Sequence, residues 1–312
     1  MQKYGFIFPG QGSQKLGMLS NLAGEYSVVK ETFDQASDLL NTNLWEIAQW
    51  DSGNLLDRTD ITQPVLLTAS IAIWRIWEQM GCTPPAVMAG HSLGEYSALV
   101  CSGVIDFSDG IKLVHRRGEL MQEAVSEGEG AMAAIVGMED YQIREVCAAV
   151  AGDDVVSAAN FNSPGQTVIA GTKAAVDRAM AACKEAGAKR ALPLKVSVPS
   201  HCALMQPAAA RLSEELMPIE FRTGSIPIIQ NVNAQITTSA DEIKANLIAQ
   251  LYSPVLWVDS IKLVKSGGIT TLIECGPGKV LCGLAKRIAP EIACFGSDDP
   301  QSLQQARDEV LV

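Results

Sequence analysis

Short apolar runs of β-strand length alternate with turns and amphipathic segments along the chain. The clearest runs are 4–8, 86–90 and 270–275. The first and third are followed by glycine-rich turns, and the second and third lead into helix-type segments. This alternation is typical of a parallel α/β sheet, in which functional residues gather at the carboxyl ends of the strands. We therefore predict an α/β core with a parallel sheet.

The middle of the chain has a different order of elements. Its pattern predicts strands at 131–137, 154–160, 166–170 and 190–196, helices at 140–150 and 173–187, and a hairpin turn at 162–165. The order βαββαβ is the ferredoxin-like arrangement. We predict that residues 129–197 form a ferredoxin-like subdomain inserted into a core of residues 1–128 and 198–312. A cleft between the two is the expected substrate site.

Composition and charge exclude several classes of protein. Apolar residues make up 47% of the 312 residues, as in a globular chain. The formal net charge of −11 argues against nucleic-acid binding, because proteins that bind nucleic acids carry a basic surface. The most apolar stretch, 65–74, is shorter than the ~20 residues that span a bilayer, and residues 1–8 lack a signal-peptide core. We predict a cytoplasmic protein without a membrane segment.

Cysteines and histidines bear on redox state and on metals. The eight cysteines form no C-x-x-C pair and mostly lie in apolar surroundings, so we expect buried free thiols in a reducing compartment. Only three histidines are present, which argues against a histidine-rich metal site. No metal is predicted.

Residues 90–94 read Gly-His-Ser-Leu-Gly, a G-x-S-x-G motif between a strand-type run and a helix-type segment. A nucleophile elbow requires this context, because glycines allow a tight strand-to-helix turn that exposes the serine hydroxyl at the helix N-terminus. The motif alone also fits a structural Gly-Ser turn. The strand and helix around it favour Ser92 as a nucleophile.

A serine nucleophile needs a base, and three histidines are available. His91 adjoins Ser92, so its side chain leaves the elbow in another direction. His115 lies on a helix with no loop to open a cleft around it. His201 lies in the loop 198–201, after the last predicted strand of the insert. Loop position and elimination favour His201 as the base.

The imidazole must be oriented by an acceptor for its Nδ1 proton. No sequence rule selects an Asp or Glu for this role, so a carboxylate and a main-chain carbonyl both remain open. The helix that begins at Ala240 ends near 250–252, and its last carbonyls lack partners within the helix. One of these carbonyls is a candidate.

The oxyanion formed on serine attack needs donors already in place. The amide of Leu93, first in its helix, is one candidate, and the amide of Gln11 in the glycine-containing loop 10–14 is another. A dinucleotide-binding turn is the alternative for this loop, but Lys15 stands where G-x-G-x-x-G requires its third glycine. We therefore reject nucleotide binding.

Arg117 interrupts the amphipathic pattern of the helix-type segment 111–124. It falls inside a stripe of apolar residues, whereas Arg116 joins the polar stripe. A guanidinium directed toward the interior is costly without an anion. Two partners are open: a carboxylate of the protein itself, or a substrate carboxylate bound by two hydrogen bonds.

Together these residues resemble the malonyl-CoA:acyl carrier protein transacylase family over nearly the whole chain. The matching stretches are FPGQGSQ at 8–14, TQP at 62–64, GHSLGEY at 90–96, RG at 117–118, NFNSPGQ at 160–166, PSH at 199–201 and QLYSPV at 250–255. The resemblance implies a hydrolase-like core with a ferredoxin-like insert. It also implies that malonyl moves from malonyl-CoA to the thiol of acyl carrier protein through an ester on Ser92, in fatty acid biosynthesis.

The same resemblance implies a role for each candidate residue. The catalytic pair is Ser92 and His201. The supporting residues are the oxyanion-hole amides of Gln11 and Leu93, the carboxylate-binding Arg117, the carbonyl of Gln250 that orients His201, and the pocket residues Gln63 and Asn160. No cofactor is implied, because coenzyme A is part of the substrate.

Two residues bear on the choice of acyl group. In related acyltransferases a branched apolar residue after the serine accompanies malonyl, which Leu93 fits. Many malonyl-selective relatives carry Phe before the catalytic histidine, where this chain has Ser200. Use of methylmalonyl therefore remains open.

Acyl carrier proteins are acidic, so a chain of charge −11 needs a local basic patch to bind them. The candidates are Lys189, Arg190 and Lys195 on the insert and Lys286 with Arg287 near the C-terminus.

Three other functions remain open at this stage: an acyltransferase of a polyketide pathway, a serine esterase, and a carrier-binding module without catalysis. Arg117 argues against an esterase, because neutral esters have no carboxylate to match it. A binding module would need neither Ser92 nor His201.

Overall fold

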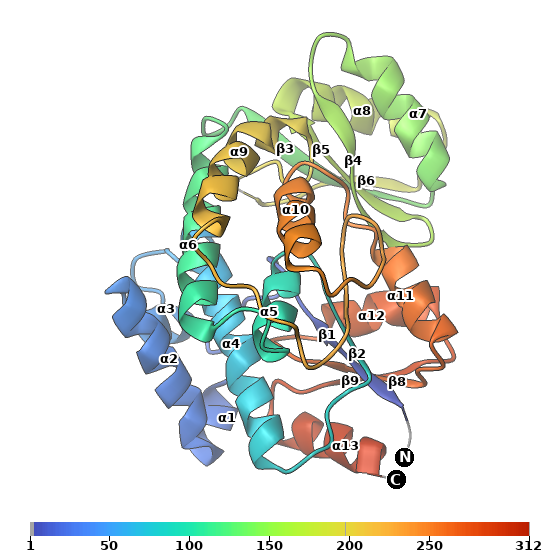
Figure 1. The fold of residues 1–312 in the computed structure, drawn as a ribbon. Coiled ribbons are helices and arrows are strands. Elements are labelled where there is room, and N and C mark those ends of the chain that lie inside the picture. The colour runs from blue at the N-terminus through green and yellow to red at the C-terminus, as the bar shows by residue number, and fades with distance from the viewer. Residues whose placement is uncertain (1–2, 197, 312) are drawn as a thin grey trace.

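The computed structural model describes residues 3–196 and 198–311, so the predicted boundaries at 1, 197 and 312 lie outside the described residues. Within the described residues the chain forms a five-stranded and a four-stranded sheet (Figure 1). The predicted α/β class is confirmed.

The larger sheet has the strand order β7-β2-β1-β8-β9, and every neighbouring pair is parallel. Its strands are β1 (Tyr4–Phe8), β2 (Val87–Gly90), β7 (Ile228–Ile229), β8 (Thr271–Glu274) and β9 (Ala293–Gly296). All residues of β1, β2 and β8 are buried, as expected of parallel strands covered on both faces. The three predicted strands of the core are confirmed.

Helices connect and cover these strands. They are α1 (Ser20–Glu25), α2 (Ser27–Leu40), α3 (Leu44–Gln49), α4 (Thr59–Gln79), α5 (Leu93–Cys101), α6 (Phe107–Glu123), α9 (Gln206–Leu216), α10 (Ala240–Gln250), α11 (Trp257–Ser266), α12 (Val280–Ile288) and α13 (Pro300–Leu311), with a short 3-10 turn at Ala203–Met205. The apolar stretch 65–74 lies in α4, which is buried along most of its length. In residues 3–196 and 198–311, no helix combines the length and the apolar character that a membrane span requires.

The smaller sheet contains β3 (Gly130–Val136), β4 (Val156–Ser163), β5 (Gln166–Thr172) and β6 (Arg190–Pro193), with α7 (Asp140–Ala151) and α8 (Lys173–Glu185) between them. Its order β4-β5-β3-β6 with antiparallel pairing is the ferredoxin-like topology that the sequence predicts. The boundaries at 129 and 197 stay a prediction.

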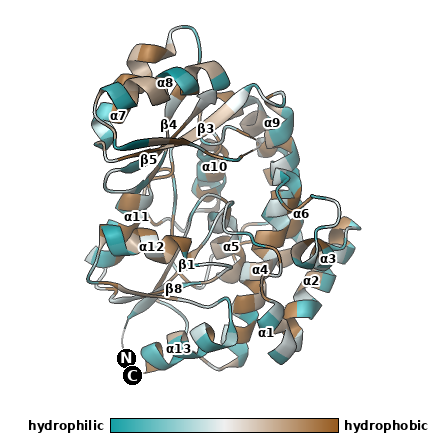
Figure 2. Cartoon of the chain, turned by 180° about the vertical axis from the view of Figure 1, so that it is seen from behind, coloured by the Kyte–Doolittle hydropathy of each residue, from teal (hydrophilic) through white to brown (hydrophobic). Residues whose placement is uncertain are grey.

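Two details of the insert differ from the predicted pattern. Strand β4 continues through Ser163, because residues up to that position still pair with β5, so the turn is shorter than 162–165. Strand β6 ends at Pro193, before the predicted end at 196, although the Leu194 amide still donates to the carbonyl of Met132 at 2.9 Å. Hydrophilic positions lie along α7 and α8 on the outside of the insert (Figure 2).

The insert is joined to the core beside β4. The Phe161 amide donates to the carbonyl of Val255 at 3.0 Å, and the Val255 amide donates to the carbonyl of Ala159 at 2.9 Å. One face of the small sheet packs against α7 and α8, whereas Met132 and Val168 on the other face border a cavity shared with the core. The cavity therefore lies between the core and the insert, where the sequence predicts a cleft.

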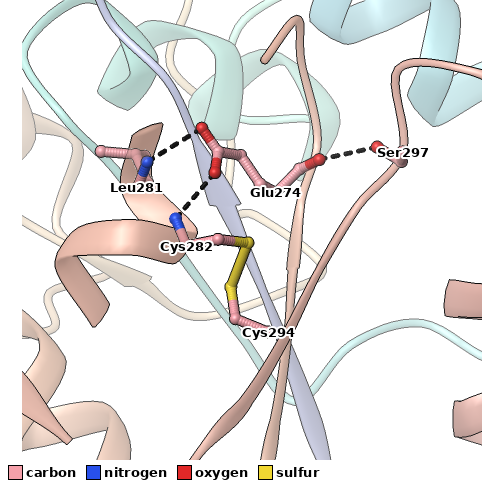
Figure 3. Close-up of a disulfide and its surroundings, with 5 residues drawn as sticks. All are labelled: Glu274, Leu281, Cys282, Cys294 and Ser297. Atoms are coloured by element: carbon pink, nitrogen blue, oxygen red, sulfur yellow. Dashed lines mark hydrogen bonds between the residues drawn. A yellow bond between two sulfur atoms is a disulfide. The ribbon is translucent and has the colours of Figure 1, made fainter. Parts of the chain in front are cut away.

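Cysteine pairing differs from the prediction. Cys282 in α12 and Cys294 in β9 form a disulfide, with their Cα atoms 5.3 Å apart (Figure 3). The expectation of free thiols is wrong for these two, because the return of the chain from α12 into β9 brings them together. The other six cysteines all lie in the described part of the chain and are free, five of them buried.

The same figure shows why α12 begins where it does. The carboxylate of Glu274, at the end of β8, accepts hydrogen bonds from the amides of Leu281 at 3.1 Å and Cys282 at 2.8 Å (Figure 3). These amides have no acceptor within the helix, so the carboxylate satisfies them. Burial raises the pKa of Glu274 to about 7.

Candidate active site

Ser92 lies in a strained turn between β2 and α5. Its backbone has φ 52° and ψ −109°, a conformation that non-glycine residues rarely adopt. The flanking glycines are required by space: a Cβ on Gly90 would lie 1.9 Å from the carbonyl carbon of Gly94, and a Cβ on Gly94 would lie 2.0 Å from the carbonyl oxygen of Phe8. This is the geometry of a nucleophile elbow.

His201 lies against the serine, although 109 residues separate the two in sequence. Ser92 Oγ is 2.8 Å from His201 Nε2, and His201 Nδ1 is 2.7 Å from the carbonyl oxygen of Gln250. A carbonyl only accepts, so Nδ1 carries the proton and the lone pair of Nε2 faces the serine hydroxyl. The acceptor left open by the sequence is thus a main-chain carbonyl at the end of α10.

The imidazole is held in its neutral form. Burial, and secondly the positive charge of Arg117, lower the pKa of His201 from 6.5 to about 3. At neutral pH the ring is therefore uncharged, with a proton on Nδ1 only, and Nε2 is able to accept the serine proton.

The other two histidines have different partners. His91 Nε2 lies 2.8 Å from Asn162 Oδ1, so its ring points from the elbow toward the insert. His115 Nδ1 lies 2.8 Å from the carbonyl oxygen of Asp60. The closest polar contact of each ring is therefore with a residue other than Ser92. This agrees with the sequence analysis, which rejected His91 and His115 as the base.

Arg117 extends from α6 into the interior and is 1% exposed. Its guanidinium donates to Gln63 Oε1 at 2.8 Å, to Gln250 Oε1 at 3.0 Å and to Ser92 Oγ at 3.4 Å, and lies 5.2 Å from the centre of the Tyr96 ring. No carboxylate of the described residues forms an ion pair with it. Of the two partners considered from the sequence, a protein carboxylate is therefore not the one in place.

Arg116, its neighbour, has the opposite surroundings. Its side chain is 30% exposed and pairs with Glu119 at 2.8 Å and Glu215 at 2.9 Å. Of these adjacent arginines, Arg116 thus forms ion pairs near the surface, whereas Arg117 is a buried cation with no carboxylate of the described residues within ion-pair distance.

A cavity of about 160 Å³ opens over the serine. This is smaller than the ~300 to 1,000 Å³ of pockets for drug-sized ligands. Its wall includes the predicted residues Gln11, Leu93, Arg117 and Asn160 together with Ser92 and His201. Gln63 is buried behind the guanidinium rather than on the wall, where it accepts from Arg117.

Residues that the sequence did not indicate also support the site. Asn231 Oδ1 accepts from the Ser92 amide at 2.7 Å, and the Gln250 side chain donates to Glu95 Oε2 at 2.7 Å. Asn231 belongs to no motif, and a Glu in the first turn of a helix is ordinary because it favours the helix dipole. Only the fold brings Asn231 to the serine, whereas Glu95 lies within the matching stretch 90–96.

The arrangement supplies a nucleophile, a neutral base and a cation in one small cavity. Such a set can form and transfer an ester on Ser92, and can recognise an acyl group that carries a negative charge. Within the described residues, no three His, Cys, Asp or Glu side chains gather as metal ligands do.

Comparison with known proteins places the chain in a family. Residues 5–287 match the family model of the acyl transferase domain. The malonyl CoA-acyl carrier protein transacylase of Escherichia coli (strain K12) is 53% identical over 306 residues, covering 98% of this chain and 99% of that protein. The chain belongs to the malonyl CoA-acyl carrier protein transacylase family. The family member of Bacillus subtilis (strain 168) is 45% identical over 307 residues, covering 98% and 96% of the two chains.

Solved structures of the family have the same fold. An acyl carrier protein S-malonyltransferase from Vibrio cholerae O1 is 56% identical, with a TM-score of 0.95 over 97% of this chain and 99% of that one. A malonyl-transacylase in complex with its holo type II PKS acyl carrier protein is 52% identical, with a TM-score of 0.98 over 99% and 100% of the chains. The hydrolase-like core with its ferredoxin-like insert is therefore confirmed.

Proposed function

We propose that this chain is a malonyl-CoA:acyl carrier protein S-malonyltransferase that forms a malonyl ester on Ser92. The observation that carries the proposal is the buried guanidinium of Arg117, which has no protein carboxylate and lies beside the Ser92–His201 pair. The family membership supports the same reaction, because the relatives are named for it.

In the first half-reaction His201 Nε2 takes the proton from Ser92 as Oγ attacks the thioester carbonyl carbon. The negative charge that develops on the carbonyl oxygen is stabilised by the amides of Gln11 and Leu93. The tetrahedral intermediate then expels the coenzyme A thiolate, and His201 returns the proton to its sulfur. The carbonyl of Gln250 keeps Nδ1 protonated and stabilises the transient imidazolium.

In the second half-reaction the carrier's phosphopantetheine thiol replaces coenzyme A. His201 removes the thiol proton, the sulfur attacks the ester carbonyl, and the proton passes to Ser92 Oγ as the serine leaves. A thioester forms and an ester breaks, so no oxidant or cofactor is required. The enzyme returns to its starting state, as in a ping-pong cycle.

Arg117 selects the acyl group in this proposal. A malonyl carboxylate can accept two charge-assisted hydrogen bonds from the guanidinium and compensate for the cost of burying it. Acetyl and simple esters leave the guanidinium without an anion, which disfavours them. A serine esterase is therefore the weaker alternative.

We also propose a pathway and a location for this reaction. Transfer of malonyl to acyl carrier protein supplies fatty acid biosynthesis, and we propose this role in the cytoplasm. One structural relative is complexed with a type II PKS carrier protein, so transfer in a polyketide pathway is the second candidate. Supplying purified carriers of both kinds and comparing kcat/KM decides between them.

Mixing the protein with malonyl-CoA and measuring its intact mass tests the reaction. We expect a mass increase of one malonyl group that maps to Ser92 and disappears when holo acyl carrier protein is added. An esterase would release malonate without loading the carrier, and a binding module would gain no mass. Either result would reject the proposal.

A further inference from the structure

The strained backbone of Ser92 is held by two distant side chains. Its amide donates to Asn231 Oδ1 at 2.7 Å, and its carbonyl accepts from Gln250 Nε2 at 3.0 Å. Asn231 also donates to the carbonyl of Gly90 at 2.6 Å, so it spans the turn. A strained conformation persists only when its surroundings fix it, and these contacts fix both peptide groups of Ser92.

The side chain of Gln250 links this turn to Arg117. Its Oε1 accepts from the guanidinium, while its Nε2 lies near three acceptors: Ser92 O at 3.0 Å, Glu95 Oε2 at 2.7 Å and Asn231 Oδ1 at 3.4 Å. The orientation of the amide is therefore determined by its neighbours. A flipped amide would turn its NH₂ group toward the guanidinium, which has no acceptor for it.

Glu95 is the third residue of this hydrogen-bond network, with Gln250 and Asn231. Its Oε2 accepts from both Gln250 Nε2 at 2.7 Å and the Asn231 amide at 3.1 Å, and its side chain is 1% exposed. Its Oε1 has no hydrogen-bond partner among the described residues. One carboxylate oxygen thus supports both residues that hold Ser92.

We propose that Glu95 is a positioning residue for malonyl transfer: it holds Gln250 and Asn231, and through them Arg117 and Ser92, and it acts as a hydrogen-bond acceptor rather than as a charge. The proposal rests on the transfer reaction proposed above. Burial raises the pKa of Glu95 to about 7, which agrees with a site that tolerates the uncharged form. A proton on Oε1 would leave both hydrogen bonds to Oε2 intact.

The proposal distinguishes two substitutions of similar volume. Glu95→Gln keeps an oxygen where Oε2 lies, so both donors remain paired. Glu95→Met removes the acceptor and leaves two buried N–H groups, on Gln250 and Asn231, without it. Among the described residues the Asn231 amide is then left without its acceptor, and Gln250 Nε2 loses the shortest of its three contacts. Both groups are held less firmly, so the Met variant should lose catalysis while the Gln variant retains it.

The test measures acylation by malonyl-CoA and by acetyl-CoA in wild type, Glu95→Gln and Glu95→Met, with the melting temperature of each. We expect Glu95→Gln to stay within about threefold of wild type. In Glu95→Met we expect kcat/KM to fall about 100-fold for malonyl-CoA and about tenfold for acetyl-CoA. The displaced Ser92 slows the reaction of both substrates, whereas the displaced Arg117 guanidinium weakens only the binding of malonyl, which carries the carboxylate.

Two results would overturn the proposal. If Glu95→Gln loses as much activity as Glu95→Met, the negative charge of Glu95 is required, and a hydrogen-bond acceptor at that position is not sufficient. If both substrates fall equally with the melting temperature, the role is only structural. If Glu95→Met does not fold, Gln250→Met serves as the test, because it removes the side-chain amide that Glu95 holds and keeps the main-chain carbonyl that orients His201. We expect a greater loss of activity for malonyl-CoA than for acetyl-CoA. An equal loss for the two substrates would contradict the proposed network. Absence of acylation in wild type would instead reject the proposed function.

Discussion

The two sides of the cavity are built differently. On the core side each reactive group is fixed by another polar group: His201 by a carbonyl, Arg117 by two glutamine oxygens, and Ser92 by the Asn231 side chain. On the insert side the wall is mainly apolar, formed by Met132, Val168, Leu194 and Val196. We therefore expect the core side to determine the chemistry and the charge recognition, and the insert side to limit the size of the acyl group.

The largest expected effects lie on the core side. Ser92→Ala should abolish acyl-enzyme formation, and His201→Ala should lower turnover on the order of a thousandfold or more, because the two residues act as one unit. Intact-mass measurement and steady-state rates check both. Transfer close to wild type in either variant contradicts the assignment of these residues.

Binding of the carrier protein allows the core and the insert to be compared directly. Lys286 and Arg287 are exposed on α12 of the core, and Lys189 and Arg190 are exposed on the insert. Reversing Lys286 and Arg287 to Glu should raise KM for the acidic carrier on the order of tenfold without changing KM for malonyl-CoA, because complementary charge guides association. The matched double reversal at Lys189 and Arg190 shows whether the insert takes part. Equal changes for both substrates would contradict docking at α12.

A change in the apolar wall should alter selectivity more than rate. Val168→Ala enlarges the cavity, so malonyl transfer should stay within about threefold while the ratio of methylmalonyl to malonyl transfer rises about tenfold, in line with the energy of one methyl group in a pocket. Ile169→Val is the control, because Ile169 lies on the opposite face of the same strand, toward α7 and α8. An unchanged ratio in Val168→Ala would show that the insert does not set acyl size.

The smallest effect concerns pH. Arg117 is the second cause of the low pKa of His201, so Arg117→Ala should raise that pKa and move the acid limb of the acylation rate to higher pH. The comparison uses acetyl-CoA in a Glu95→Gln background, which removes the site carboxyl whose pKa burial raises to about 7. If the acylation rate falls at the same pH with and without Arg117, the charge of Arg117 does not affect the pKa of His201.

The same depressed pKa affects stability. The folded protein keeps His201 neutral, whereas in the unfolded chain its pKa is near 6.5. The unfolded state therefore binds more protons below pH 6.5, and this contribution to the free energy of unfolding is lost as pH falls from 6.5 toward 3.

Much of the site was predictable because its signals are local. The elbow occupies five consecutive residues, Arg117 departs from the periodicity of a single helix, and the free carbonyl near Gln250 follows from where α10 ends. Most contacts between distant segments have no local signal; the pairing of Ser92 with His201 was predicted because only three histidines are available. Asn231 meets Ser92 across 139 residues, and no pattern in sequence specifies that packing.

The disulfide illustrates the same limit at shorter range. Cys282 and Cys294 are only 12 residues apart, yet their pairing depends on how α12 packs against β9. The sequence pattern predicts the helix, whereas the short strand β9 was not predicted. The pattern does not predict which side chains meet between them.

Measuring malonyl and acetyl transfer side by side on Arg117→Ala, with its melting temperature, tests the central claim most directly. Losing two charge-assisted hydrogen bonds, each worth roughly 1.5 to 3 kcal/mol, should reduce malonyl transfer about 100-fold or more. Acetyl transfer should be kept or increased, because the variant no longer buries a guanidinium without an anion. A parallel fall of both substrates together with the melting temperature would contradict the recognition of a carboxylate by Arg117.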